Sequence, residues 1–395
     1  MNKNHQNQTN KSARPFRVLV MDGGGMRGLY AATVLQSLLA LCEDGHEPSL
    51  HNKNLNEAAL EKLIASSCAA GLSLNEWFDF MAGTSTGGLL AATLAYGCTL
   101  EEIIDIYKGS GSEIFPYPMP DQPSRTINSL AMSSWALRFR DKCPGNPEVL
   151  RRKLAEFLGA TTLRGLWEEK GVALCIPVTN VTDHSSLVFK TPHSVSPADG
   201  YDAESADYSL VDVCMATAAA PILFPLALVA DPADPGDQTR LTACTDGGLW
   251  ANSPVLISLI EAMKLHEGRP IEMVVLGSTG LADDQNITPD SAGWGIIDWG
   301  MNARLLELAL EVQSQGHYQT ALALLPFLNV KPTPTIVRLP YSFPSSKDAP
   351  LFGMDKAKPK ALAAMRRMAL ADALRIYGKI CNNEAGFGML KAMFS

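Results

Sequence analysis

A strand, a glycine-rich turn and a helix follow one another twice within the first hundred residues, and this repeat constrains the fold more than any other feature. The first copy runs from the apolar stretch 16–21 through the loop 22–28 into an apolar helix at 29–41. The second runs from 77–82 through the loop 83–88 into an Ala- and Leu-rich helix. Apolar runs that end in glycine turns and continue as helices are typical of buried parallel strands. The repeat predicts a three-layer α/β/α fold around a central, mostly parallel sheet.

The later sequence supplies further elements of both kinds. Apolar runs predict strands at 172–178, 187–189, 241–245, 271–276 and 335–339. Helical periodicity predicts helices at 147–158, 254–265, 301–325 and 357–380. No linker divides these elements, so we expect a single domain over 15–395.

Three parts of the chain are expected to differ from that core. Residues 1–14 are polar and read as a disordered tail. The stretch 109–147 is rich in Gly, Pro and Ser and is expected to form a lid-like surface excursion. Residues 355–395 are expected to form a C-terminal helical extension beyond a motif-bearing core of 16–340, and the segment 43–62 reads as an insertion loop leading into a helix.

Composition narrows the compartment and the partners. The net charge of −8 and the pI near 5.4 argue against binding to a nucleic-acid polymer. The eight cysteines form no C-x-x-C pair, which indicates reduced thiols and neither a disulfide framework nor a metal site. The N-terminus lacks an apolar signal region, so we expect a cytoplasmic protein. The uncharged segment 213–230 is interrupted by two prolines and is expected to be a buried helix followed by a loop, not a membrane span.

The second glycine loop contains Gly83-x-Ser85-x-Gly87 between a predicted strand and a predicted helix. Small residues around a serine permit a tight turn that exposes its hydroxyl, and the helix N-terminus directs positive charge at a developing anion. The pattern also occurs by chance in ordinary glycine turns. Ser85 is therefore a candidate nucleophile, with the plain turn as the alternative.

The first glycine loop fits two functions. Gly23-x-Gly25-x-x-Gly28 matches a dinucleotide-binding fingerprint, but the polar region after 41 lacks the second strand and acidic residue which that fold requires. The backbone N–H groups of three successive glycines could instead surround one oxygen as an oxyanion hole. Arg27 then adds positive charge, is solvated, or forms a structural salt bridge; the sequence leaves these three roles open.

A nucleophilic serine needs a base. His184 and His193 flank a predicted strand, and neither lies in an obvious catalytic loop. Asp246-Gly247-Gly248 ends a short predicted strand, where the glycines allow another loop to approach the carboxylate. Taken alone, Asp-Gly-Gly is more often an ordinary turn.

Together, these motifs resemble those of the patatin-like phospholipase family, which carries D-G-G-G-x-R-G, G-x-S-x-G and D-G-G or D-G-A in this order. Here they are Asp22–Gly28, Gly83–Gly87 and Asp246–Gly248. The flanks are similar too, notably Ala216–Pro221, Phe224-Pro225 and Asp246–Pro254. The resemblance covers roughly residues 16–340.

The resemblance implies a role for each motif. Ser85 is the nucleophile and Asp246 the general base of a Ser–Asp dyad, supported by Gly83, Gly87, Gly247 and Gly248. The amides of Gly23, Gly24 and Gly25 form the oxyanion hole, with Arg27 beside it. No metal and no cofactor is implied.

The implied reaction is hydrolysis of a phospholipid acyl ester through an acyl-serine intermediate, at the inner face of the membrane. The chain also resembles the phospholipase effectors of cyclic-oligonucleotide anti-phage signalling (CBASS), which implies a cyclic-nucleotide activator and leaves a homo-oligomer open. A housekeeping lipase, a nucleotide-binding α/β enzyme and a non-catalytic lipid-binding scaffold are the alternatives.

Overall fold

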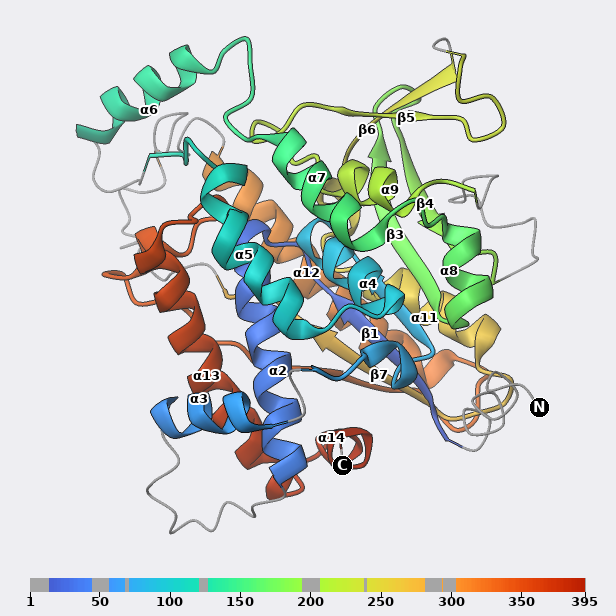
Figure 1. Ribbon diagram of the computed structural model, residues 1–395. Coiled ribbons are helices and arrows are strands. Elements are labelled where there is room, and N and C mark those ends of the chain that lie inside the picture. Colours follow the sequence, from blue (N-terminus) through green and yellow to red (C-terminus); the bar gives the residue numbers. More distant parts are fainter. Residues whose placement is uncertain are drawn as a thin grey trace.

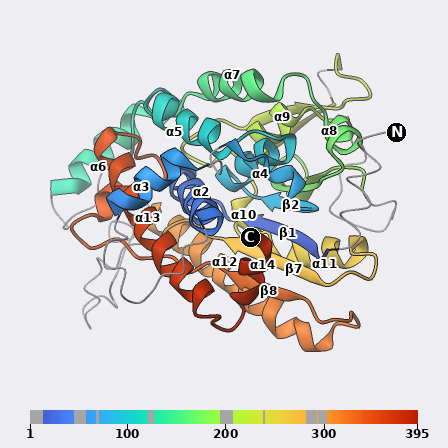
Figure 2. The ribbon, with the colours of Figure 1, turned by 60° about the horizontal axis from the view of Figure 1, so that its bottom comes forward.

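The structure, a computed structural model, describes residues 14–44, 57–67, 71–120, 127–193, 207–237, 240–280, 293 and 303–394. It consists of one central sheet with helices on both faces (Figures 1 and 2). The expected three-layer α/β fold is therefore confirmed. Residues 45–56 of the 43–62 segment and residues 1–13 of the N-terminal tail lie outside the described residues.

Eight strands of the described residues form the sheet, and their path is β5-β6-β3-β2-β1-β7-β8 with β4 also paired to β3. They are β1 (Phe16–Met21), β2 (Phe80–Gly83), β3 (Ala173–Asn180), β4 (Ser185–Lys190), β5 (Ala227–Ala230), β6 (Leu241–Asp246), β7 (Ile271–Leu276) and β8 (Thr335–Arg338). The run β3-β2-β1-β7-β8 is parallel, as predicted. Strands β4, β5 and β6 pair antiparallel at the other end, which makes the sheet mixed.

Strands β2 and β6 share one edge of β3. Cys175 of β3 pairs with β2 and β4, and Val178 pairs with β4 and β6. Because a strand has two edges and β4 takes one of them, β2 and β6 must lie end to end along the other. The end of β2, which leads to the 83–88 loop, and the end of β6, which is Asp246, therefore face each other.

Helices cover the two faces unequally. The first face carries α2 (Gly28–Asp44), α3 (Glu57–Ser66), α4 (Thr86–Tyr96), α5 (Leu100–Ile114), α7 (Pro147–Leu158), α8 (Leu163–Lys170), α9 (Leu210–Thr217), α13 (Pro359–Cys381) and α14 (Gly388–Phe394). The second carries α11 (Val255–Leu265) and α12 (Ala303–Leu324). Leu19 of β1 packs in the first core and Val18 and Val20 in the second, because successive side chains of a strand point to opposite faces.

Several short elements complete the chain. They are η1 (Gly25–Arg27), η3 (Leu74–Glu76), α6 (Ile127–Arg138), α10 (Gly248–Ala251), η6 (Leu325–Phe327) and η7 (Ala349–Leu351). Figure 1 shows α6 standing away from the body of the molecule. None of the helices in the described part of the chain is long and apolar enough to cross a bilayer.

The prediction of a lid-like surface excursion at 109–147 is wrong for residues 109–114. Residues 109–114 complete α5, and Ser110, Gly111 and Ile114 are buried there. A side chain at Gly111 would lie 2.7 Å from Met26 and 3.3 Å from Ala357, so the glycine allows α5 to pack closely where its composition had suggested a flexible segment. Within the rest, α6 adds a second regular element.

Two other expectations need correction. Strand β2 begins at Phe80, not at 77, because Trp77 still donates its N–H to Leu74 O in the 3-10 turn η3. The segment 213–230 begins with the end of the buried helix α9, as expected, but its last four residues form β5, which pairs with β6 along one edge. The sequence could not show this strand because its partner lies in a different segment.

The two ends of the described chain are tied to the body. Arg14, assigned to the tail, forms an ion pair of 2.7 Å with Asp79. Helix α13 of the C-terminal extension packs along α2, and its apolar face is continuous with the first core. The seven cysteines within the described residues are free thiols.

Candidate active site

Ser85 lies in the sharp turn between β2 and α4. Its backbone has φ 56° and ψ −127°, a conformation that a non-glycine residue rarely adopts. Its N–H donates to Thr217 Oγ1 at 2.9 Å, and that hydroxyl donates to Pro177 O at 2.8 Å. Thr217, at the end of α9, thus holds the strained backbone of Ser85 in place. The side chain of Ser85 faces a cavity.

The glycines on either side make this turn sterically feasible. A Cβ at Gly83 would lie 2.0 Å from Gly87 O, and a Cβ at Gly87 would lie 2.3 Å from Met21 O. Neither position has room for a side chain. Both glycines of the G-x-S-x-G motif are therefore required by packing.

Asp246, the last residue of β6, is brought to Ser85 by the pairing of β6 with β3. Its side chain lies beside that of Ser85, and Gly248 N donates to Asp246 Oδ1 at 2.7 Å. Burial raises the pKa of this carboxyl to about 6, against the lowering effect of the Ser85 hydroxyl and the Gly248 N–H. A Cβ at Gly247 would lie 2.2 Å from Pro177 O, so this glycine also permits a close backbone approach.

The glycine loop 23–25 lies against the same serine. A Cβ at Gly23 would be 3.2 Å from Ser85 Cβ and 2.3 Å from Asn252 Oδ1. Gly25 has φ 56°, and a Cβ there would be 2.3 Å from Met354 O. The loop is packed so closely on both sides that only glycine fits.

The structure corrects one member of the expected oxyanion hole. Gly23 donates its N–H to Asn252 O at 2.9 Å, so this amide is engaged within the protein. Within the described residues, neither Gly24 nor Gly25 donates its N–H to a protein acceptor. The candidate donors at the cavity are therefore Gly24 and Gly25.

In the part of the chain that the structure describes, Arg27 is neither a solvated loop residue nor a salt-bridge partner, the two alternatives to a role at the site that the sequence left open. Its side chain is buried, its Nε donates to Gly24 O at 3.2 Å, and it lines the cavity. It is not solvated, and within the described part of the chain no carboxylate lies within ion-pair distance of it. Its charge is therefore placed beside the glycine loop.

The cavity that Ser85 and Asp246 line has a volume of about 1060 Å³ and is mostly apolar. One part of its wall comes from α4, α5 and α7, with residues such as Leu90, Ile103 and Leu154. Another part comes from α12 and from the segment 343–356. Apolar walls of this extent suit a hydrocarbon chain better than a polar ligand.

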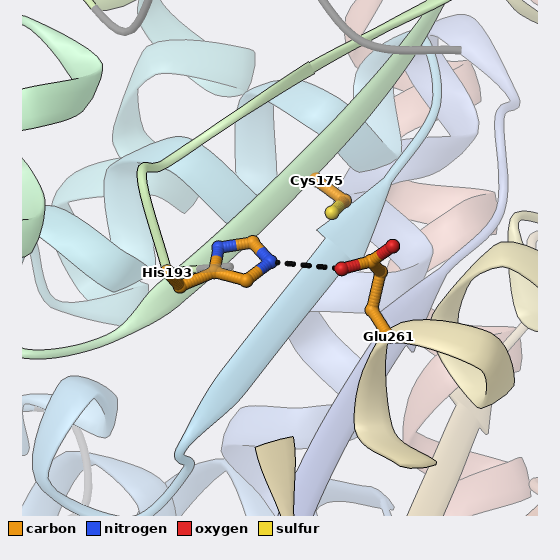
Figure 3. Close-up of side chains that lie close together, drawn as sticks. All are labelled: Cys175, His193 and Glu261. Atoms are coloured by element: carbon orange, nitrogen blue, oxygen red, sulfur yellow. Dashed lines mark hydrogen bonds and ion pairs between the residues drawn. The ribbon is translucent and has the colours of Figure 1, made fainter. Parts of the chain in front are cut away.

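Neither histidine considered as a base lies near Ser85. His184 is exposed in the turn between β3 and β4. The side chain of His193 is buried on the second face of the sheet, where its Nε2 lies 3.2 Å from Glu261 Oε2 (Figure 3). Its Nδ1 lies 2.6 Å from Thr191 Oγ1. Neither side chain lines the cavity.

Figure 3 also shows Cys175 beside this pair, and the ligand atoms of Cys175, His193 and Glu261 lie within 4.8 Å of one another. The charges do not favour a cation there. Lys264 and Lys190 approach Glu261 Oε1 at 2.9 and 3.7 Å. Burial alone would raise the pKa of Glu261, but His193, Lys264 and Lys190 lower it to about 2. The cluster is accounted for as a buried glutamate neutralised by its neighbours.

Sequence reasoning missed the residues that hold the loops. Asn252 and Met354 bind the glycine loop through their carbonyl groups, and Thr217 fixes Ser85. Ser278 donates to Gly23 O at 3.2 Å. Carbonyl contacts carry no residue-type signature, although Thr217 and Asn252 do lie in the flanks that resemble the family.

A serine at a strained strand-to-helix turn, a buried carboxylate in contact with it and free glycine amides beside an apolar cavity define a hydrolase site. The sequence model described as "Patatin-like phospholipase" matches residues 19–259. The chain belongs to this family and is a hydrolase of the phospholipase type. This family membership overturns the interpretation of the first glycine loop as a dinucleotide-binding fingerprint.

Curated relatives are similar over most of the chain. A cGAMP-activated phospholipase of Vibrio cholerae is 26% identical over 76% of this chain and 75% of its own length. Patatin-like protein 4 of Arabidopsis thaliana is 27% identical over 75% of this chain and 68% of its own length. A cGAMP-activated phospholipase of Pseudomonas aeruginosa is 31% identical over 62% of this chain and 56% of its own length.

Proposed function

We propose that the protein hydrolyses a fatty acyl ester of a phospholipid, with Ser85 as nucleophile and Asp246 as general base. The contact between these two side chains at the wall of a large apolar cavity is the observation that carries this proposal. Asp246 takes the proton from the Ser85 hydroxyl as its oxygen attacks the ester carbonyl. A pKa near 6 leaves the carboxylate charged at neutral pH and makes it a stronger base than an exposed aspartate.

The developing oxyanion accepts hydrogen bonds from the amides of Gly24 and Gly25, with the charge of Arg27 nearby. Asp246 then returns the proton to the leaving alcohol, and the acyl group stays on Ser85. A water molecule, deprotonated by Asp246, releases the fatty acid in the second half of the cycle.

The test is Ser85→Ala, with Ser258→Ala as a matched control. Ser258 is buried too, at 0% exposed against 9% for Ser85, but it lies on α11, where its hydroxyl donates to Pro254 O at 2.8 Å. We expect Ser85→Ala to abolish hydrolysis of a soluble ester and labelling by a fluorophosphonate probe, and Ser258→Ala to keep both. Substantial turnover by a folded Ser85→Ala protein would refute the nucleophile assignment.

We further propose that the substrate is reached at a phospholipid bilayer, which the protein binds peripherally. Large apolar side chains remain exposed at the cavity wall: Ile222, Leu249, Leu308 and Phe343 are 41–57% exposed. Leu305 and Val312 continue the exposed stripe of Leu308 along α12, at spacings of three and four residues. An acyl chain could pass from the bilayer into the cavity between such residues without crossing water.

Finally, we propose that a cyclic oligonucleotide activates the enzyme, as the names of two relatives state for those proteins. On this proposal the enzyme acts in anti-phage defence at the inner membrane, and the activator works through the lid-like excursion or through self-association. Purified protein should hydrolyse phospholipid vesicles slowly, and one member of a panel of cyclic di- and trinucleotides should raise the rate at least about tenfold. High activity that no member of the panel changes would instead indicate a housekeeping lipase.

A further inference from the structure

Asp22, immediately before the glycine loop, carries a buried carboxylate that is paired with Arg338. Arg338 Nη2 lies 2.5 Å from Asp22 Oδ2, and the two side chains are 11% and 2% exposed. The partners are 316 residues apart in the sequence. Arg338 also lies beyond the part of the chain that the family model matches.

The parallel strands β1, β7 and β8 bring these residues together. Asp22 follows β1, Gly277 follows β7, and Arg338 ends β8, so all three lie at the carboxyl edge of neighbouring strands. The arginine passes Gly277 to reach Asp22, and a Cβ on that glycine would lie 3.0 Å from Arg338 Nη2. The guanidinium carbon also lies 5.8 and 5.4 Å from the ring centroids of Tyr318 and Tyr341.

The carboxylate of Asp22 is therefore a side-chain anchor for the entry to the loop. The backbone anchors at this end are the bonds from Asp22 N to Leu276 O at 3.0 Å and from Gly23 N to Asn252 O at 2.9 Å. At the other end, Met26 N donates to Met354 O at 2.7 Å. Gly24 and Gly25 lie between these two sets of anchors.

We propose that Arg338 is a positioning residue that acts through Asp22 to keep the amides of Gly24 and Gly25 directed at the cavity. This inference rests on the proposed oxyanion role of those amides. It adds to the reaction a residue from the far end of the chain, which touches neither substrate nor Ser85. A loop displaced by about 1 Å would lose much of the advantage of prearranged donors.

The positive charge of Arg338 stabilises the ionised carboxylate of Asp22. Burial raises the pKa of Asp22, and the positive charge of Arg338 is the largest influence that lowers it. Glu311 also faces the pair and accepts a hydrogen bond from Tyr341 at 2.7 Å, so a second acid lies close by. Without Arg338, Asp22 would be buried near that acid with no counter-charge, and it would have to take up a proton or move toward water.

The test compares Arg338→Met with Arg269→Met. Arg269 forms a partly buried pair with Asp79, at 3.2 Å and with exposures of 15% and 6%, at the opposite, amino edge of the sheet, where Asp79 also pairs with Arg14. On a soluble ester, we expect Arg338→Met to lower kcat about 10- to 100-fold with KM changed less than about threefold. Fluorophosphonate labelling of Ser85 should slow in parallel. Arg269→Met should lower the melting temperature but keep kcat.

Two further variants separate positioning from stability. Arg338→Lys, which keeps the charge but not the planar fork, should recover part of the lost kcat. Adding Asp22→Asn to Arg338→Met should cost little more, because both changes break one contact. If Arg338→Met does not fold, Asp22→Asn alone carries the same expectation for kcat and KM.

The outcomes are separable from those of the proposed function. If Ser85→Ala is inactive while folded Arg338→Met keeps kcat within about twofold of the unaltered protein, the positioning role is wrong and the nucleophile stands. Equal losses of kcat in Arg338→Met and Arg269→Met would also overturn it, since they would reflect general destabilisation. A change confined to KM would do the same.

Discussion

At the scale of single residues, the candidate site contains a carboxyl group, that of Asp246, whose burial disfavours its charged form. Asp246 is buried, and its pKa is raised to about 6 from the ordinary value of 3.8. The proposed mechanism needs the charged carboxylate of Asp246. In the folded protein this form becomes the minor one below about pH 6. On the proposed mechanism, the site therefore loses stability in order to hold a more reactive carboxylate, as many catalytic sites do.

This conflict predicts opposite pH trends for activity and stability. As base, Asp246 must be ionised, so kcat/KM on a soluble ester should rise to a plateau above pH 6 and fall about tenfold per pH unit well below it. Because the folded pKa is the higher one, the stability linked to the proton is fully present below pH 3.8 and is lost as the pH rises through 6.

Asp246→Asn should therefore remove activity yet stabilise the fold by up to about 3 kcal/mol at pH 8, with little gain at pH 4. Denaturant unfolding of both proteins at the two pH values measures this. A stabilisation that is the same at both pH values would show that the aspartate is not buried in its charged form.

Gly25 offers a second test at this scale. At φ 56° and with Met354 O 2.3 Å from any Cβ, Gly25→Ala should displace the loop and lower kcat by about 10²-fold. Gly171→Ala is the matched control, since Gly171 has φ 61° but open space around it. The control should cost about 1 kcal/mol of stability and no activity. Kinetics and melting curves of both variants on a soluble ester distinguish the two effects; equal kcat in both would refute an active role for the loop.

At the scale of elements, helix α12 both lines the cavity and exposes large apolar side chains on the surface. Leu306 and Leu310 line the cavity, whereas Leu305 and Val312 are 47% and 58% exposed. With a net charge of −8, the protein gains no general attraction to an anionic bilayer. For the proposed binding to a bilayer, insertion of apolar side chains from this helix is the favourable contribution that remains.

We therefore expect Leu305→Ser with Val312→Ser to lower hydrolysis of zwitterionic phospholipid vesicles about tenfold or more, because each buried apolar side chain contributes about 1.5–3 kcal/mol. Hydrolysis of a soluble ester should be unchanged. Ile260→Ser on α11 is the control, since Ile260 is 51% exposed and lies outside the cavity wall. An equal loss for Ile260→Ser, or a loss on the soluble ester, would refute docking through α12.

At the scale of the whole molecule, the C-terminal extension behaves as part of the core. One face of α13 is buried, and Tyr30 of α2 donates to Asp372 Oδ2 at 2.5 Å, where Ser342 N also donates at 2.8 Å. The basic residues of this helix, such as Lys360 and Arg367, lie on its exposed face. This arrangement agrees with a single domain in which α13 covers α2, the helix that follows the glycine loop.

If this is so, Ile376→Ala should destabilise the entire protein by about 2–5 kcal/mol, since it opens a cavity in a shared core. Arg367→Ala, on the exposed face, should change the free energy of unfolding by less than about 0.5 kcal/mol. Unfolding should stay a single transition when followed by tryptophan fluorescence and by circular dichroism. A separate early transition in Ile376→Ala would show that the extension folds as an independent unit.

The sequence alone determined what depends on neighbouring residues. Strands β1 and β7 and helix α7 begin and end where apolar runs and helical periodicity predicted. The turn around Ser85 and the family motifs were also visible, because glycines that tolerate no Cβ leave a local pattern. Such features follow from backbone sterics and periodicity, which act over a few residues.

Only the tertiary structure decided which of these groups meet. The shared edge of β3 brings Asp246 to Ser85, and the bond from Gly23 to Asn252 removes one expected oxyanion donor. Arg338 reaches Asp22 only because β8 lies two strands away from β1. These contacts join segments up to 316 residues apart, and their energies depend on burial and strand pairing that no local pattern encodes.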